Sequence, residues 1–89
     1  MYVVERSNRK GKKWMVTLPN GKQVHYGADG YEDFTIHKDP KRKKNYIARH
    51  RKREDWTKRG IDTAGYWSRW HLWNKPDSID SLQDIADRS

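Results

Sequence analysis

Residues 36–59, IHKDPKRKKNYIARHRKREDWTKR, carry both a strong helix signal and all of the excess charge of this chain. Asp39 followed by Pro40 favours a helix start, because an Asp side chain caps free N–H groups and Pro is tolerated at the first helical position. The stretch contains eleven Lys or Arg against three acidic residues, and the net charge of the whole 89-residue chain is also +8. The rest of the chain therefore contains equal numbers of basic and acidic residues. We expect a basic helix over residues 39–55 whose surface meets something anionic.

The apolar residues of this helix form a narrow stripe of Tyr46, Ile47 and Ala48. One narrow face can dock on a sheet while the remainder stays solvated. A run of charge is usually only a solvated helix face, but the local excess here is large enough to favour a binding surface.

The N-terminal residues 1–27 predict a small three-stranded antiparallel β-meander. Residues 13–18 alternate between apolar and polar positions, and the turn sequence Asn20-Gly21 readily supplies positive φ angles. Residues 31–37 are ambiguous between a short helix and an extended segment. We favour a turn or short helix with Tyr31, Phe34 and Ile36 packed inward.

Two further helices are expected after the basic one. Residues 63–73 predict a Trp-rich helix, since Tyr66, Trp70 and Trp73 fall at i, i+4 and i+7. This helix is aromatic on more than one side, so it is expected to lie between the sheet and the basic helix.

Residues 77–88 predict a short acidic amphipathic helix. Asp77 or Ser78 is the expected cap, and the apolar positions are Ile79, Leu82 and Ala86, with Ile85 beside them. This tail is expected either to fold back on the basic helix or to dock on a neighbouring subunit.

The length and composition of the chain limit its possible fold and its possible location in the cell. With 89 residues and 33% hydrophobic content, residues 1–89 form one small α+β domain with a thin core, in which five Trp and five Tyr replace missing aliphatic residues. There is no Cys, no stretch long enough to span a membrane and no hydrophobic signal core. The protein is expected to be neither secreted nor membrane-bound.

The sequence carries no motif typical of an enzyme. The four His residues form no i, i+4 pair or HExxH pattern, so no metal ligand set is predicted. The acidic residues near His37 resemble turn and cap residues, and no glycine-rich phosphate loop precedes a helix. We predict no catalytic residue, no metal and no cofactor.

The charge favours binding to nucleic acid through its backbone, without sequence specificity, because Lys and Arg on successive helical turns neutralise phosphates. The predicted phosphate-binding residues are Lys41, Arg42, Lys43, Lys44, Arg49, Arg51, Lys52, Arg53, Lys58 and Arg59. Candidate base-stacking residues or interface anchors are Trp56, Trp67, Trp70 and Trp73. The alternative is an acidic protein surface, such as that of a capsid, with self-association as a further option.

The chain resembles a family of small uncharacterised proteins encoded by large DNA viruses of algae and protists and by marine phages. The resemblance covers roughly residues 12–82. The matching motifs are His25 to Gly27, Gly30 to Thr35, His37 to Asp39, Tyr46 to His50, Glu54 to Trp56, Thr63 to Gly65, Ser68 with Arg69, and Leu72 to Pro76. It implies a virus-encoded, non-catalytic component of the host cytoplasm or the virion. Such a component either contacts the genome or serves as a minor capsid or cement protein.

Overall fold

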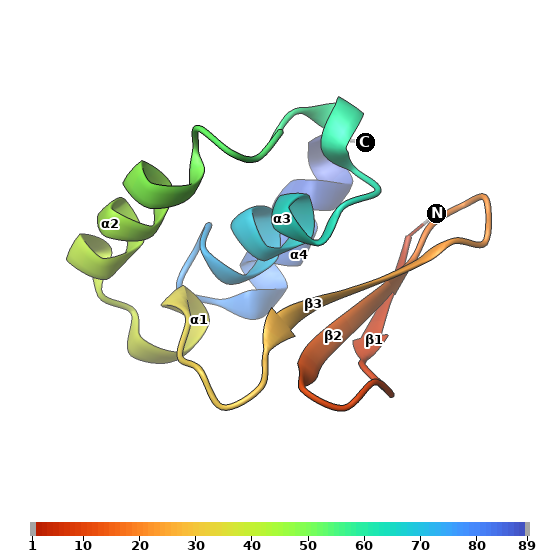
Figure 1. Cartoon of the computed structure of the whole chain (residues 1–89), viewed down its shortest axis with the longest axis horizontal. Coiled ribbons are helices and arrows are strands. Elements are labelled where there is room, and N and C mark those ends of the chain that lie inside the picture. Colours follow the sequence, from red (N-terminus) through yellow and green to blue (C-terminus); the bar gives the residue numbers. More distant parts are fainter. Residues whose placement is uncertain (1, 89) are drawn as a thin grey trace.

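The computed structural model describes residues 2–88 and has the predicted α+β architecture. A sheet lies at one end of the molecule and α2 at the other, with α3 and α4 between them (Figure 1). The strands are β1 (Val3–Arg6), β2 (Lys12–Thr17) and β3 (Gln23–Ala28). The helices are α1 (Phe34–His37), α2 (Pro40–His50), the 3-10 turn η1 (Lys58–Gly60), α3 (Ala64–Trp67), the π-helical turn η2 (Ser68–Leu72) and α4 (Ser78–Arg88). The predicted meander began at Met1, which lies outside the described residues.

The sheet is the predicted antiparallel meander, in the order β1-β2-β3. Its β2–β3 turn forms where the sequence indicates: Gly21 has a φ of 89°, which only glycine adopts without strain. The Leu18 N–H donates to the Lys22 carbonyl at 2.8 Å, and the Asn20 side chain accepts from the Lys22 N–H at 2.9 Å. Local turn chemistry therefore fixes the register of β2 and β3.

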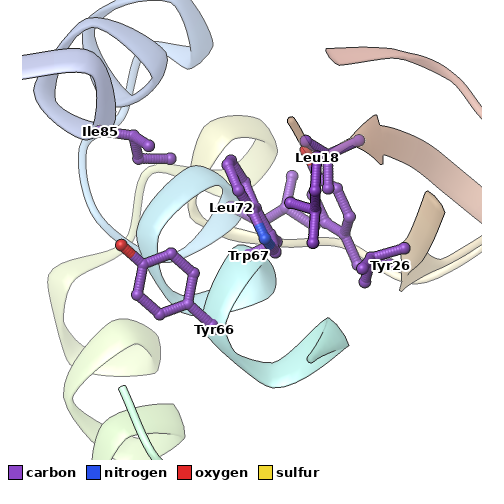
Figure 2. Packing of buried hydrophobic residues seen from close by; sticks show 8 residues of the cluster. Leu18, Tyr26, Tyr66, Trp67, Leu72 and Ile85 are labelled. Atoms are coloured by element: carbon purple, nitrogen blue, oxygen red, sulfur yellow. The ribbon is translucent and has the colours of Figure 1, made fainter. Parts of the chain in front are cut away.

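The core lies between the sheet and the helical segment formed by α3 and η2. Figure 2 shows Tyr66, Trp67 and Leu72 on this segment, with Leu18 and Tyr26 on one side and Ile85 of α4 on the other. Trp67 is completely buried, and its indole N–H donates to the Ile61 carbonyl at 2.7 Å. Three large aromatic side chains, those of Tyr26, Tyr66 and Trp67, thus belong to this core.

His71 joins three layers of the structure from within the core. It is completely buried, with Nδ1 2.7 Å from the Tyr26 hydroxyl and Nε2 2.6 Å from the Ser78 hydroxyl. A neutral imidazole satisfies both contacts, because one ring nitrogen donates and the other accepts. Burial lowers the pKa of His71 to about 4, although the charge of Asp33 acts in the opposite direction.

A buried ion pair fastens α1 to the sheet. Asp33 caps α1 by accepting from the Thr35 N–H at 2.9 Å, and its other oxygen lies 2.8 Å from Lys13 Nζ of β2. Lys13 also donates to the Tyr31 carbonyl. The two side chains of the ion pair are only 11% and 4% exposed, so separating them would leave an uncompensated charge.

The short helix expected in residues 31–37 is present, but only part of its packing was predicted. Phe34 is buried, whereas Tyr31 and Ile36 are 74% and 55% exposed. The inward placement of Tyr31 and Ile36 was wrong. A single helical turn that ends at Lys38, with φ 55°, has only a narrow inner face, which Phe34 and His37 occupy.

Helix α2 begins as predicted. Asp39 caps it by accepting from the Lys41 N–H at 3.0 Å, and Pro40 is its first residue. The helix ends at His50, and residues 51–53 continue as a turn rather than extending the helix to residue 55.

Tyr46 is the buried residue of helix α2 and its main apolar contact with the rest of the molecule. The Tyr46 ring stacks on the Trp73 ring, with centroids 4.3 Å apart and planes 2° from parallel. The expected docking of α2 on the sheet was wrong, because the α3–η2 segment ending near Trp73 provides the contact surface instead. As predicted, this Trp-rich segment lies between the sheet and α2, and a cleft separates α2 from β2 and β3.

Helix α4 packs differently from the prediction. Asp77 caps it, but its buried residues are Ser81 and Ile85, whereas Ile79 is 76% exposed and Ala86 is also exposed. Ile79 and Ala86 were among the expected apolar positions of this helix, but neither is buried. Helix α4 packs on η2 rather than on α2, and this contact turns Ser81 and Ile85 inward.

We expect Tyr46→Ala to lower the free energy of unfolding by about 3 kcal/mol, because it deletes the buried ring that holds α2. Urea denaturation measures this change. Tyr31→Ala is the matched control and is expected to stay within about 0.5 kcal/mol of wild type, since Tyr31 is exposed. Equal losses in the two variants would contradict the attachment of α2 through Tyr46.

Acid is expected to destabilise the fold through His71. Between pH 6.5 and about 4 the unfolded chain binds a proton at this residue and the folded chain does not, so stability falls as the pH falls. The slope contributed by one such group is at most about 1.4 kcal/mol per pH unit. Urea denaturation across this range should show a weaker pH dependence for His71→Gln than for wild type. Parallel curves would contradict the burial of a neutral imidazole.

Candidate nucleic-acid interface

Most of the predicted phosphate-binding residues lie on the surface of α2 and the segment after it. The exposed members are Lys41, Arg42, Lys44, Arg49, Arg51, Lys52, Arg53, Lys58 and Arg59. Within residues 2–88, Arg42 alone of these nine has an ion pair, which joins it to Glu32 at 3.2 Å. Both of those side chains are about half exposed, so the pair contributes little to stability. We call the other eight residues the basic ridge.

The three acidic residues of the same stretch are outnumbered by its eleven Lys and Arg, and each also has a structural partner. Asp39 caps α2, and Glu54 accepts from the Trp56 indole N–H at 3.0 Å. Asp55 accepts from the backbone and the hydroxyl of Thr57, and these hydrogen bonds lower its pKa. The local charge excess is therefore presented to solvent.

Lys43 differs from the other predicted site residues because it points inward. Its Nζ donates to the Asn74 carbonyl at 2.5 Å and lies 5.0 Å from the centre of the Phe34 ring. Burial, and then the charge of Arg69, lower the pKa of Lys43. Lys43 is therefore part of the packing between α2, α1 and the end of η2.

The four candidate Trp residues have different surroundings. Trp67 is completely buried in the core, so it offers no ring face to a base or a partner. Trp70 is flanked by the guanidinium groups of Arg69 and Arg88, at 4.3 and 3.6 Å from its ring centre. Trp56 and Trp73 are half-buried, and both stack against Tyr46. A binding role for Trp56, Trp70 and Trp73 stays a prediction.

Arg69 is a half-buried cation for which no role was predicted from the sequence. Its guanidinium lies between Trp56 and Trp70, and NH1 donates to the Trp73 carbonyl at 2.9 Å. It has no ion pair with a carboxylate in the described part of the chain. Burial lowers the pKa of Arg69, which is thus stabilised mainly by ring faces and one carbonyl.

A cleft of about 1000 Å³ lies behind the basic ridge, between α2 and the sheet. Arg42, Asn45 and Arg49 line it on the α2 side, and Lys12 and Lys13 line it on the β2 side. Sequence analysis did not assign Lys12 to a site, because it lies far from the basic stretch. Only the folded chain brings the start of β2 opposite α2.

Among residues 2–88 there is no group of three His, Cys, Asp or Glu side chains arranged to hold a metal ion. Across the same range no helix has the length and apolar character needed to cross a membrane.

Comparison with known proteins identifies a family but not an activity. The model of a family of unknown function, DUF5754, matches residues 2–50, more than half of the chain. The chain belongs to DUF5754. Neither a curated protein nor a solved structure gives a significant match.

The DUF5754 match covers the sheet, α1 and α2 and ends at His50. It therefore includes both walls of the cleft, with Lys12 and Lys13 on one and Arg42 and Arg49 on the other. The Trp73 surface on which α2 packs lies beyond the matched residues.

The contrast between Lys43 and its neighbour Lys44 gives a test of this geometry. We expect Lys43→Glu to lower the free energy of unfolding by about 2 kcal/mol, because it breaks a half-buried charge-assisted hydrogen bond and places a carboxylate against a carbonyl. Lys44→Glu, at an exposed position, is expected to change it by less than about 0.5 kcal/mol. Urea denaturation of both variants measures the difference, and equal stabilities would contradict the inward position of Lys43.

Proposed function

We propose that this DUF5754 protein is a non-enzymatic binding protein that contacts the nucleic-acid backbone through the basic ridge. The observation that carries the proposal is the set of eight exposed Lys and Arg side chains of the ridge, none of which has an ion pair within the described residues. Each Lys or Arg that meets a phosphate releases a condensed counterion, and this release drives binding without sequence readout.

The shape of the ridge suits backbone contact. Lys44 and Arg51 lie seven residues apart, which places them on one face of α2 and the turn that continues it. Nothing in this surface resembles a recognition helix with base-reading side chains, so contact with phosphates is the expected mode.

The setting of this function follows from the family resemblance and is part of the proposal. A virus-encoded or phage-encoded protein with a basic ridge would act on nucleic acid in the host cytoplasm or within the virion. The matched family supplies no activity that argues for or against this setting.

A second candidate function is a virion structural role, as a minor capsid or cement component. Two exposed isoleucines support it, since Ile36 and Ile79 are 55% and 76% exposed and each offers an apolar anchor to a partner protein. In that case the basic ridge would face an acidic capsid-protein surface. The presence of the protein at stoichiometric copy number in particles without genome would favour this candidate.

The salt dependence of binding tests the proposed function. Fluorescence anisotropy with labelled duplex and single-stranded DNA is expected to show binding that weakens steeply with salt. Lys44→Gln with Arg51→Gln should weaken binding at low salt and reduce the slope of log K against log salt by roughly one unit for each lost contact.

A charge-matched control is available on the two hairpin turns, which lie across the molecule from α2 (Figure 1). Arg9→Gln with Lys22→Gln removes the same charge and should have little effect. No binding at low salt, or equal losses in the two double variants, would contradict the proposal.

A further inference from the structure

We propose that the cleft between α2 and the sheet binds a single strand of nucleic acid, with phosphates held between Lys12 and Arg49 and a base stacked on Tyr31. This inference rests on the proposed function and assigns it a second surface, distinct from the outward side of α2. It uses two residues, Lys12 and Tyr31, that the proposed function does not require.

The size of the cleft favours a single strand over a duplex. Its volume of about 1000 Å³ matches the upper range of pockets that enclose small ligands, which is enough for a few nucleotides. A double helix is too wide to enter such a space, so a duplex is restricted to the outer face of the ridge.

The charges in the cleft leave one cation free on each wall. Lys13 is paired with Asp33 and Arg42 with Glu32, and the remaining carboxylate, that of Glu54, lies 3.7 Å from His50. Lys12 on β2 and Arg49 on α2 have no ion pair within residues 2–88. Phosphates of a strand that enters the cleft would meet each of these cations without displacing an existing pair.

The basic residues of α2 divide between two faces. Arg42 and Arg49 are seven residues apart and both line the cleft, whereas Lys44 and Arg51 have the same spacing on a different face. Charged side chains that only keep a helix solvated would face open water and would not need to face a cleft. Arg49 and Lys12 facing the same space therefore point to an anionic occupant.

Tyr31 provides an unused aromatic surface at the edge of the cleft. It lines the cleft, its side chain is 74% exposed, and its ring contacts no other aromatic ring in the described part of the chain. A base stacks on such a ring face in many proteins that bind single strands without sequence preference. This role explains an exposed Tyr that contributes nothing to the core.

The test compares three charge-matched double variants for binding to labelled oligothymidylate of about ten nucleotides, a length within the site sizes of single-strand binders. Lys12→Gln with Arg49→Gln removes the free cations of the cleft, and Lys44→Gln with Arg51→Gln removes two from the outer face. Arg9→Gln with Lys22→Gln removes the same charge from residues outside the cleft lining and serves as the control. All three are first compared with wild type by urea denaturation, so that loss of binding is not confused with unfolding.

We expect the cleft variant to weaken oligothymidylate binding by about tenfold or more at low salt, with a smaller effect on duplex binding. Tyr31→Ala should weaken oligothymidylate binding by roughly 5-fold to 150-fold and leave duplex binding unchanged. These two results together would support the cleft as the single-strand site.

The other outcomes separate the two proposals. If only the outer-face variant weakens binding, the cleft assignment fails and the proposed function stands. If wild type binds neither nucleic acid, both fail. If a polyglutamate peptide of equal charge binds as tightly and Tyr31→Ala does not change oligothymidylate affinity, the cleft is overturned as a nucleic-acid site in favour of an acidic protein.

Discussion

The position of the basic helix depends on one aromatic contact, the stacking of Tyr46 on Trp73. Tyr46 is the buried residue of α2, and the inward-pointing Lys43, which donates to the Asn74 carbonyl, adds a second contact beside it. The two rings lie almost parallel, and the Tyr46 ring also stacks on His50 with centroids 4.4 Å apart. A cationic helix is thus held mainly by ring stacking, so most of its Lys and Arg side chains are not needed to attach it.

The buried pair of Lys13 and Asp33 supports the same arrangement from the sheet side. It ties β2 to the start of α1, and α1 leads directly into α2. The sheet and α2 are therefore fixed to each other at both ends of the cleft, through this ion pair and through Trp73. A space held open between two fastened walls is better suited to binding than one formed by a mobile helix, because less ordering is required of the protein.

The sequence predicted those features that depend on local chemistry. The Asn20-Gly21 turn, the Asp39-Pro40 helix start and the α+β class all follow from residues that are close together in the chain. The buried face of each helix was harder to predict. Ile79 and Ile85 lie in similar local sequence, and only the position of η2 decides which of the two is buried. The residues of the candidate site also include some that local sequence predicts and some that it does not. Exposed charges on α2 were predictable, whereas the inward turn of Lys43 and the approach of Lys12 depend on tertiary packing.

The most direct test of the basic helix as a nucleic-acid surface is a titration of ¹⁵N-labelled protein with oligothymidylate, followed by backbone amide chemical shifts. The account predicts that the largest changes fall on α2, the turn at residues 51–53 and the start of β2. The amides of α4 and β1 should move little, because these elements do not line the cleft. Changes confined to the surroundings of Ile36 and Ile79, or no changes at low salt, would contradict it.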